Sequence, residues 1–333
     1  MNKPKREHHV TPKLYLKGFV IAPRKPFIWV YKKNEPYNPG KGKLTNNPFN
    51  DSINIAGVER DFYANPGLSG SNRFEAFEND LEALEKPANK ILPKLVAGQP
   101  LSVGEKAAFA AYIIQFSRRG AAGRETINSM LSTTAVNYEP PDQLYQLTGL
   151  PKTSESRMLL KARALAVAEK PGYPIHMHQG IVNASSASFV TRALNQMNWH
   201  LIKAASGSDF VTCDNPVFFD KSLGLGSSMS EVSFPVSCEY TLFASWWKLS
   251  DQFVMEVGPD VVELVNQRTI HNSVKHVYSS KCEECIVSIF GTTVFKYRPI
   301  SPAKENFKVM EFVLTGSKDG YIKQLMALPL TAG

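Results

Sequence analysis

The spacing of hydrophobic residues changes twice along the chain, and this change most constrains the fold. Residues 8–63 and the region from Trp199 onward contain short runs of aromatic and β-branched residues between turn residues, which indicates strands. Residues 72–196 carry apolar residues at intervals of three and four, which is typical of amphipathic helices. Separate runs of strands and helices predict an α+β fold, with a mixed or antiparallel sheet packed against a helical bundle in a single integrated domain.

The N-terminal half gives specific predictions of elements. PFIWVYKK at 26–33 and SINIAGVERDFY at 52–63 are expected to be strands of a small N-terminal hairpin or sheet. Residues 72–97 predict a helix that Pro87 and Pro93 kink or divide, because a proline removes a backbone donor and crowds the preceding turn.

Ser102 followed by Glu105 forms a capping-box pattern, which predicts a helix from there to about Gly120. Further helices are expected at 154–170, about 176–196 and 259–279, and further strands in NWHLIKAA, SDFVTCDNP, VSFPVSCEYTLFAS and QFVMEVG.

Composition indicates a folded protein in a reducing compartment. Hydrophobic residues make up 43% of the 333 and charged residues 20%, so the chain can bury a sizeable core. We expect one domain over 8–300, with a flexible basic N-terminus over 1–7 and a C-terminal extension over 301–333. Four cysteines are few for this length, no secretory signal is visible, and no apolar run approaches the roughly 18 residues of a membrane span. These features predict a cytoplasmic protein without a membrane partner.

The charge balance favours an anionic partner. The formal net charge is +8, which attracts nucleic acid or nucleotides at long range. Part of this excess comes from Lys3, Lys5 and Arg6 at the N-terminus, where a solvated tail is the usual structure. The sequence identifies no protein partner.

Two segments place titratable and amide groups where chemistry could occur. His8 and His9 open an ordered, partly apolar string that includes Tyr15, and imidazole serves as a general base or a metal ligand. Asp214 and Asn215 precede a proline at the end of a strand, a position that often presents polar groups to ligands. The plainer alternatives are a histidine that bonds a neighbouring element and an ordinary Asx-Pro turn.

Helical segments supply further candidates. Gln115, Arg118 and Arg119 lie near the end of the helix that reaches Gly120, where arginine could bind an anion or only complement the helix dipole. Glu85 extends a row with Glu78 and Glu82 that could offer carboxylates to a divalent ion such as Mg²⁺, or could simply be a hydrated surface.

A structural zinc site is disfavoured. Cys282 and Cys285 have the CxxC spacing, but zinc needs four ligands and the chain has no second cysteine pair. Nucleotide-binding glycine loops, zinc-protease helices and nucleophile elbows are likewise missing from the sequence.

Four segments together resemble the bacterial family called domain of unknown function 4238: HHVTPKLYLKGF, IIQFSRRGAAGR, TCDNPV, and FPVS with LVNQRTI. The resemblance spans about residues 8–280, with Thr11 and Cys213 as departures from the family pattern. It implies no activity, because the family has none assigned. It does imply importance for nine residues, namely His8, His9, Tyr15, Gln115, Arg118, Asp214, Asn215, Ser237 and Asn266.

Imidazole, carboxylate, amide and guanidinium groups together suit a site that binds an anion and activates water. The first hypothesis is a hydrolase of phosphodiester bonds in nucleic acid or nucleotides, which would suit a bacterial defence effector. Catalysis would use His8, His9, Asp214 and Asn215, substrate binding would use Tyr15, Gln115, Arg118, Ser237 and Asn266, and a metal would use Glu85 and Asp214. The alternative is a non-catalytic nucleic-acid-binding or adaptor protein. The first hypothesis requires the paired histidines and Asp214 to share a cavity.

Overall fold

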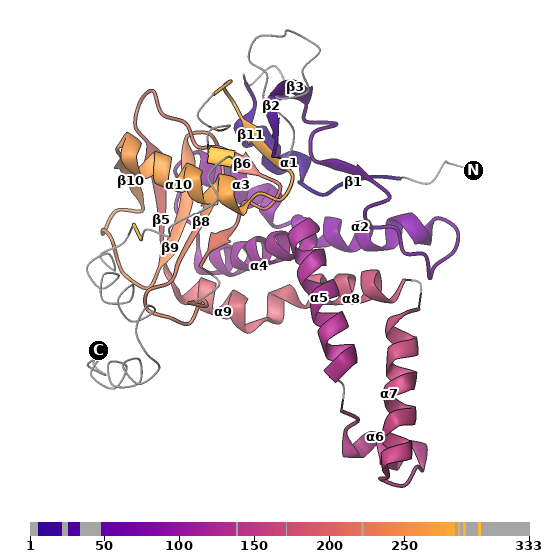
Figure 1. The fold of residues 1–333 in the computed structure, drawn as a ribbon. Helices are drawn as coiled ribbons and strands as arrows, with labels where there is room; N and C mark the ends of the chain where they lie inside the picture. The colour runs from indigo at the N-terminus through magenta and orange to yellow at the C-terminus, as the bar shows by residue number, and fades with distance from the viewer. Residues whose placement is uncertain are drawn as a thin grey trace.

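The computed structural model describes residues 6–21, 26–33, 48–137, 139–170, 172–220, 223–283, 286, 289–290 and 299–300. In Figure 1 the strands gather at one end of the molecule and most helices at the other. The predicted tail over 1–7 falls largely outside the described residues, as do Cys285 and the predicted extension over 301–333.

The largest sheet is mixed and comes from residues 198–257. Its strand order is β10-β5-β9-β8-β7, in which β10 and β5 are parallel and the other neighbours are antiparallel. The strands are β5 (Asn198–Ala204), β7 (Phe218–Phe219), β8 (Glu231–Pro235), β9 (Tyr240–Ser245) and β10 (Val254–Val257).

Both ends of the chain build a second, antiparallel sheet. Its order is β3-β2-β11-β6, so the N-terminal strand β2 lies between its hairpin partner β3 and the C-terminal strand β11. The strands are β2 (Phe27–Lys32), β3 (Phe49–Ser52), β6 (Thr212–Cys213) and β11 (His276–Ser279). A separate antiparallel pair joins β1 (Glu7–His9) to β4 (Val58–Arg60).

The helix with the capping box forms as predicted. The Ser102 hydroxyl accepts the Glu105 N–H at 3.3 Å, and the Glu105 carboxylate accepts the Ser102 N–H at 2.9 Å, at the start of α4 (Val103–Arg119). The helix predicted over 72–97 divides at Pro87, giving α2 (Asn72–Glu85) and α3 (Ala88–Val96).

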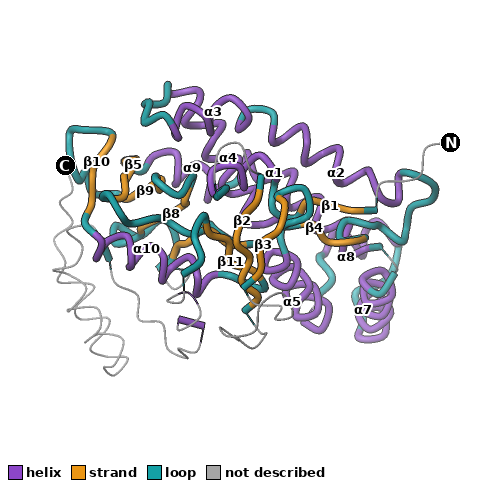
Figure 2. The backbone as a smooth tube through the Cα atoms, turned by 90° about the horizontal axis from the view of Figure 1, so that it is seen from above, coloured by secondary structure: helices purple, strands orange, loops and turns teal. Residues whose placement is uncertain are grey.

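The other helices are α1 (Lys13–Leu16), α5 (Ala121–Asn137), α6 (Asp142–Thr148), α7 (Ser154–Ala168), α8 (Tyr173–Asn183), α9 (Phe189–Gln196), α10 (Pro259–Asn272), and the 3₁₀ turns η1 (Lys17–Phe19) and η2 (Ala184–Ala187). Of these helices, α5, α8 and α9 pack directly against α4. Figure 1 shows α5, α6 and α7 projecting away from the sheets as an arm, and Figure 2 shows α2, α3 and α4 along one side of the strands.

Three predicted elements have other boundaries. The helix expected over 259–279 ends at Asn272, because the next residue is extended and 276–279 enter the sheet as β11. The strand expected over 52–63 is interrupted by a turn that ends at Gly57, whose φ of 73° favours glycine. The helix expected over 176–196 is divided into α8, η2 and α9.

One aromatic cluster joins the N-terminal segment, α4 and the large sheet. The ring of Tyr15 stacks on Phe234 of β8 with centroids 5.2 Å apart and meets the edge of Phe116 of α4 at 5.0 Å. All three side chains are buried in a core that also contains residues of β2, α3, α9 and β11. The α+β fold class is therefore confirmed. None of the described helices has the length and apolar character needed to cross a membrane.

Candidate functional site

His8 is a structural residue. Its side chain is fully buried, and its Nδ1 accepts the Tyr63 N–H at 2.9 Å. The proton must then sit on Nε2, which donates to the Phe74 carbonyl at 2.9 Å. Because both ring nitrogens form hydrogen bonds within the protein, the His8 side chain links β1 to the start of α2.

The carboxylate of Asp214 likewise forms its hydrogen bonds with the protein backbone. It accepts three N–H groups at the start of β11, from Val274 at 2.9 Å, Lys275 at 2.7 Å and His276 at 3.2 Å. Burial raises the pKa of Asp214, while these three hydrogen bonds favour the charged form. The carboxylate thus shapes the turn between α10 and β11.

Three more of the residues singled out by the family resemblance, Tyr15, Asn266 and Ser237, also form hydrogen bonds with the backbone. The Tyr15 hydroxyl donates to the Pro235 carbonyl at 2.7 Å and therefore accepts from the Thr212 hydroxyl at 2.5 Å. Asn266 accepts the Val211 N–H and donates to the Asp209 carbonyl, both at 2.9 Å. The Ser237 hydroxyl accepts the N–H groups of two following residues in the turn before β9.

The structure does bring distant segments together. A Cβ placed on Gly120 would lie 3.4 Å from the Asp214 carbonyl and 3.9 Å from Val10, so the N-terminal string, the end of α4 and the Asp214 turn are neighbours. The polar side chains of these segments nevertheless line different cavities. His9 lines a cleft to which Asp214 does not contribute, and Asn215 lines a separate groove.

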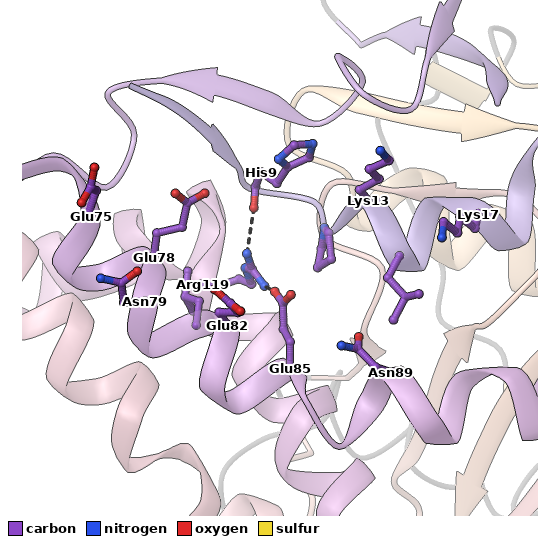
Figure 3. A pocket seen from close by; sticks show the side chains of 13 residues that line it. His9, Lys13, Lys17, Glu75, Glu78, Asn79, Glu82, Glu85, Asn89 and Arg119 are labelled. Carbon is purple, nitrogen blue, oxygen red and sulfur yellow. Dashed lines mark hydrogen bonds and ion pairs between the residues drawn. The ribbon is translucent and has the colours of Figure 1, made fainter. Parts of the chain in front are cut away.

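The cleft containing His9 lies between α1 and α2 and has a volume of about 830 Å³. One wall carries His9, Lys13 and Lys17, and the other carries carboxylates of α2 (Figure 3). The carboxylates recur at helical spacing along one face of α2, at Glu75, Glu78, Glu82 and Glu85. The α1–α2 cleft therefore has positively charged side chains on one wall and negatively charged side chains on the other.

Arg119 connects these two walls from beneath. Its buried guanidinium pairs with Glu85, and it donates to the His9 carbonyl at 2.7 Å and to the Tyr63 hydroxyl at 3.3 Å. Burial disfavours the charge, but Tyr63 and Glu85 more than offset this and hold the pKa of Arg119 above its usual value. Arg119 thereby fixes the backbone of His9 beside the cleft.

The predicted metal pair does not come together. Glu85 is engaged by Arg119 and Asp214 by backbone amides. Among the residues that the structure describes, no group of three or more His, Cys, Asp and Glu side chains is arranged to hold a metal ion.

Arg118 and Asn215 line a second cavity of about 790 Å³, the α4–α9 groove, which α5, η2 and the end of α10 also border. The Asn215 amide donates to the Asn272 carbonyl at 3.1 Å, and the Asn272 amide donates back to the Asn215 carbonyl at 2.6 Å. Gln115 is buried in α4, and neither atom of its amide has a hydrogen-bond partner among the described residues.

Comparison with known proteins identifies the family. The model of a family described as "Protein of unknown function (DUF4238)" matches residues 7–283. The chain belongs to this family. No curated protein and no solved structure matches the chain. The DUF4238 match includes every described residue that lines the α1–α2 cleft and the α4–α9 groove.

Two lysines of the cleft in this DUF4238 protein, Lys13 and Lys17, were not among the candidates taken from the sequence. Lys13 and Lys17 are four positions apart within HHVTPKLYLKGF, a spacing that places two side chains on one face of a helix. Arg119 follows Arg118 directly, but the two point to different cavities because successive helical residues are about 100° apart. The lysine spacing was a usable signal, whereas nothing local distinguishes Arg119 from its neighbour.

The burial of His178 predicts a pH-dependent stability for this DUF4238 protein. Its buried ring on α8 donates to the Arg118 carbonyl at 2.7 Å and meets the Phe77 ring edge-on. Burial lowers the pKa of His178 to about 4. An unfolded histidine titrates near pH 6.5, so its contribution is complete above that value and is lost as the pH falls towards 4.

We expect the His178 contribution to fall by about 2–3 kcal/mol between pH 7 and 4.5. Urea unfolding at both values should show this loss in the native protein and a smaller pH dependence in His178→Gln. The exposed neighbour His176 provides the control, because His176→Gln should retain the native pH dependence. An unchanged pH dependence in His178→Gln would contradict the assignment.

Proposed function

We propose that the α1–α2 cleft binds a nucleotide and that the protein hydrolyses a phosphodiester bond there. The observation that supports this most is that His9, Lys13 and Lys17 line one wall of a cleft whose other wall carries a row of glutamates. A nucleotide has the matching distribution of groups, with an anionic phosphate at one end and hydrogen-bond donors on the sugar and base at the other.

The lysine wall suits the phosphate. Lys13 and Lys17 are exposed at the cleft, so their ammonium groups can reach a phosphate as mobile point charges. On the other wall, the carboxylates of Glu78 and Glu82 can accept hydrogen bonds from ribose hydroxyls or a base amino group. A volume of about 830 Å³ lies within the range of small-molecule sites.

His9 is the residue that would activate water. It is half-buried beside the lysines, and its backbone is held by the buried Arg119. In the proposed step, the imidazole takes a proton from water as the water oxygen attacks phosphorus. The phosphorus–oxygen bond to the leaving group breaks, the leaving oxygen takes a proton from solvent, and the imidazolium returns its proton to solvent. His8 and Asp214 serve this step only by holding the surrounding chain.

The acidic wall favours a short substrate over a long polymer. A second or third phosphate bound beside Glu75 and Glu78 would meet like charge unless a divalent ion accompanied it. Mg²⁺ commonly binds through substrate phosphates and one or two carboxylates, so it belongs in the assays. A function in bacterial defence stays a prediction.

The decisive experiment measures turnover of mononucleotides, cyclic nucleotides, dinucleotides, and longer RNA and DNA, each with and without Mg²⁺ or Mn²⁺. We expect His9→Asn to reduce turnover about 10²-fold or more, since a general base commonly contributes 10²–10⁴-fold. The matched control is His176→Asn on the exposed face of α8, which should retain full activity. Lys13→Gln should mainly raise KM.

Two outcomes would count against the hydrolase. Turnover that survives His9→Asn would remove the proposed base. Binding of nucleic acid without any product, weakening steeply with salt, would instead support the non-catalytic nucleic-acid-binding protein.

A further inference from the structure

The α4–α9 groove has a different character from the α1–α2 cleft. Its walls are mainly aliphatic and aromatic, with Ile114 of α4, Ile127 and Met130 of α5, Val190 of α9, and Phe219 of β7. Of the described residues that line it, Arg118 alone is charged. A largely apolar cavity with one cation at a defined place is typical of a site for a small amphipathic anion.

Most other polar side chains of the groove already bond to the protein. Ser117 donates to the Ile114 carbonyl at 2.8 Å, and Thr126 donates to the Ala122 carbonyl at 2.9 Å. Ser188 caps α9 by accepting the Thr191 N–H. These groups stabilise local backbone and leave the recognition of a charged ligand to arginine.

Arg118 retains most of its hydrogen-bonding capacity. A guanidinium has five N–H donors, and the described contact of Arg118 is a long one, 3.3 Å from Nη1 to the Ser185 hydroxyl. No described Asp or Glu pairs with it. Burial lowers the pKa of Arg118, and an arginine remains charged throughout the physiological range. The Arg118 guanidinium is therefore a partly dehydrated cation that no described carboxylate neutralises, and this favours the binding of an anion.

The shape of the groove indicates the length of the apolar part of the ligand. Ala122, Thr126 and Met130 follow one another at intervals of four along α5, which begins after the extended residue Gly120 that separates it from Arg118 of α4. Eight residues of helix extend about 12 Å, which is the scale of a medium-length alkyl chain.

We propose that the α4–α9 groove binds an aliphatic carboxylic acid of medium chain length, with its carboxylate on Arg118 and its chain along α5. A carboxylate matches the planar fork of arginine, and two parallel hydrogen bonds can form. The site is separate from the proposed nucleotide cleft, so it does not depend on the hydrolase activity.

Isothermal titration of the full chain with octanoate, 1-octanol and octylammonium tests this assignment. Octanoate should bind at least tenfold more tightly than 1-octanol, and octylammonium should not bind. Arg118→Gln should reduce the affinity for octanoate at least tenfold and leave the affinity for 1-octanol unchanged. The matched control is Arg192→Gln, which changes an exposed arginine of α9 that does not line the groove.

A second variant keeps the proposal testable if Arg118→Gln does not fold. Ala187 is exposed at the edge of the groove, so Ala187→Trp fills part of the volume without entering the core, and it should weaken both octanoate and 1-octanol. Circular dichroism and thermal unfolding establish that each variant is folded. Equal affinity for octanoate and 1-octanol, unchanged binding in a folded Arg118→Gln, or no octanoate binding by the native protein would each overturn the proposal.

Discussion

Replacing Glu231 by glutamine is expected to lower the free energy of unfolding by about 3–5 kcal/mol, the usual loss when one member of a buried ion pair is removed. Glu231 of β8 and Arg268 of α10 are both fully buried, with Oε2 and Nη2 2.7 Å apart. The Glu231 carboxylate also accepts the Ile300 N–H at 2.9 Å. Glutamine keeps the size of the side chain but leaves the arginine charge in the core without its counterion.

Urea unfolding monitored by tryptophan fluorescence measures this loss. Glu256→Gln is the matched control, because Glu256 is exposed and lies 4.0 Å from Lys203, so its loss should cost no more than about 1 kcal/mol. The double variant Glu231→Gln with Arg268→Met should regain at least half of the lost stability, since it removes the buried charge. A single Glu231→Gln variant as stable as the control would show that the pair contributes little.

Asp214→Ala is expected to be nearly as damaging, at about 3 kcal/mol or more, because hydrogen bonds to a charged acceptor contribute about 1.5–3 kcal/mol each and two of the three donor amides are half-buried. The substitution removes the acceptor of the three N–H groups from Val274 to His276 and thus loosens the start of β11. Asp214→Asn should lose about half as much, because its amide oxygen still accepts hydrogen bonds.

The unfolding measurement separates a structural Asp214 from a catalytic one. Asp251→Ala changes an exposed aspartate that pairs with Lys248 on the surface, and its effect should stay within about 1 kcal/mol. If Asp214→Ala unfolds at the native urea concentration, the three amide contacts are not important and a direct role in chemistry regains support.

Local signals in the sequence predicted local structure well. The capping box of Ser102 and Glu105 involves atoms three residues apart, and the division at Pro87 follows from a missing N–H group, so both could be recognised without tertiary information. The helical period over 259–272 was equally clear. It failed only beyond Asn272, where pairing with β2 and β6 outweighs helical spacing.

The candidate site was harder to predict because distant backbone decides what a polar side chain does. His8 and His9 are adjacent and chemically identical, yet one is locked by Tyr63 and Phe74 and the other lines a cleft. The Asp-Asn-Pro turn was recognised as a special position. Its amide partners lie some 60 residues away, and no pattern near Asp214 reveals them.

The position of β2 in its sheet also affects how the chain folds during translation. Strand β2 ends at Lys32, but one of its two neighbours, β11, ends at Ser279, 247 residues later in the chain. At about 5–20 residues per second, a ribosome needs some tens of seconds to deliver that partner. During this interval one edge of the Phe27–Lys32 strand is unpaired on the nascent chain. A chaperone that shields aromatic segments early in translation should therefore increase the yield of native protein.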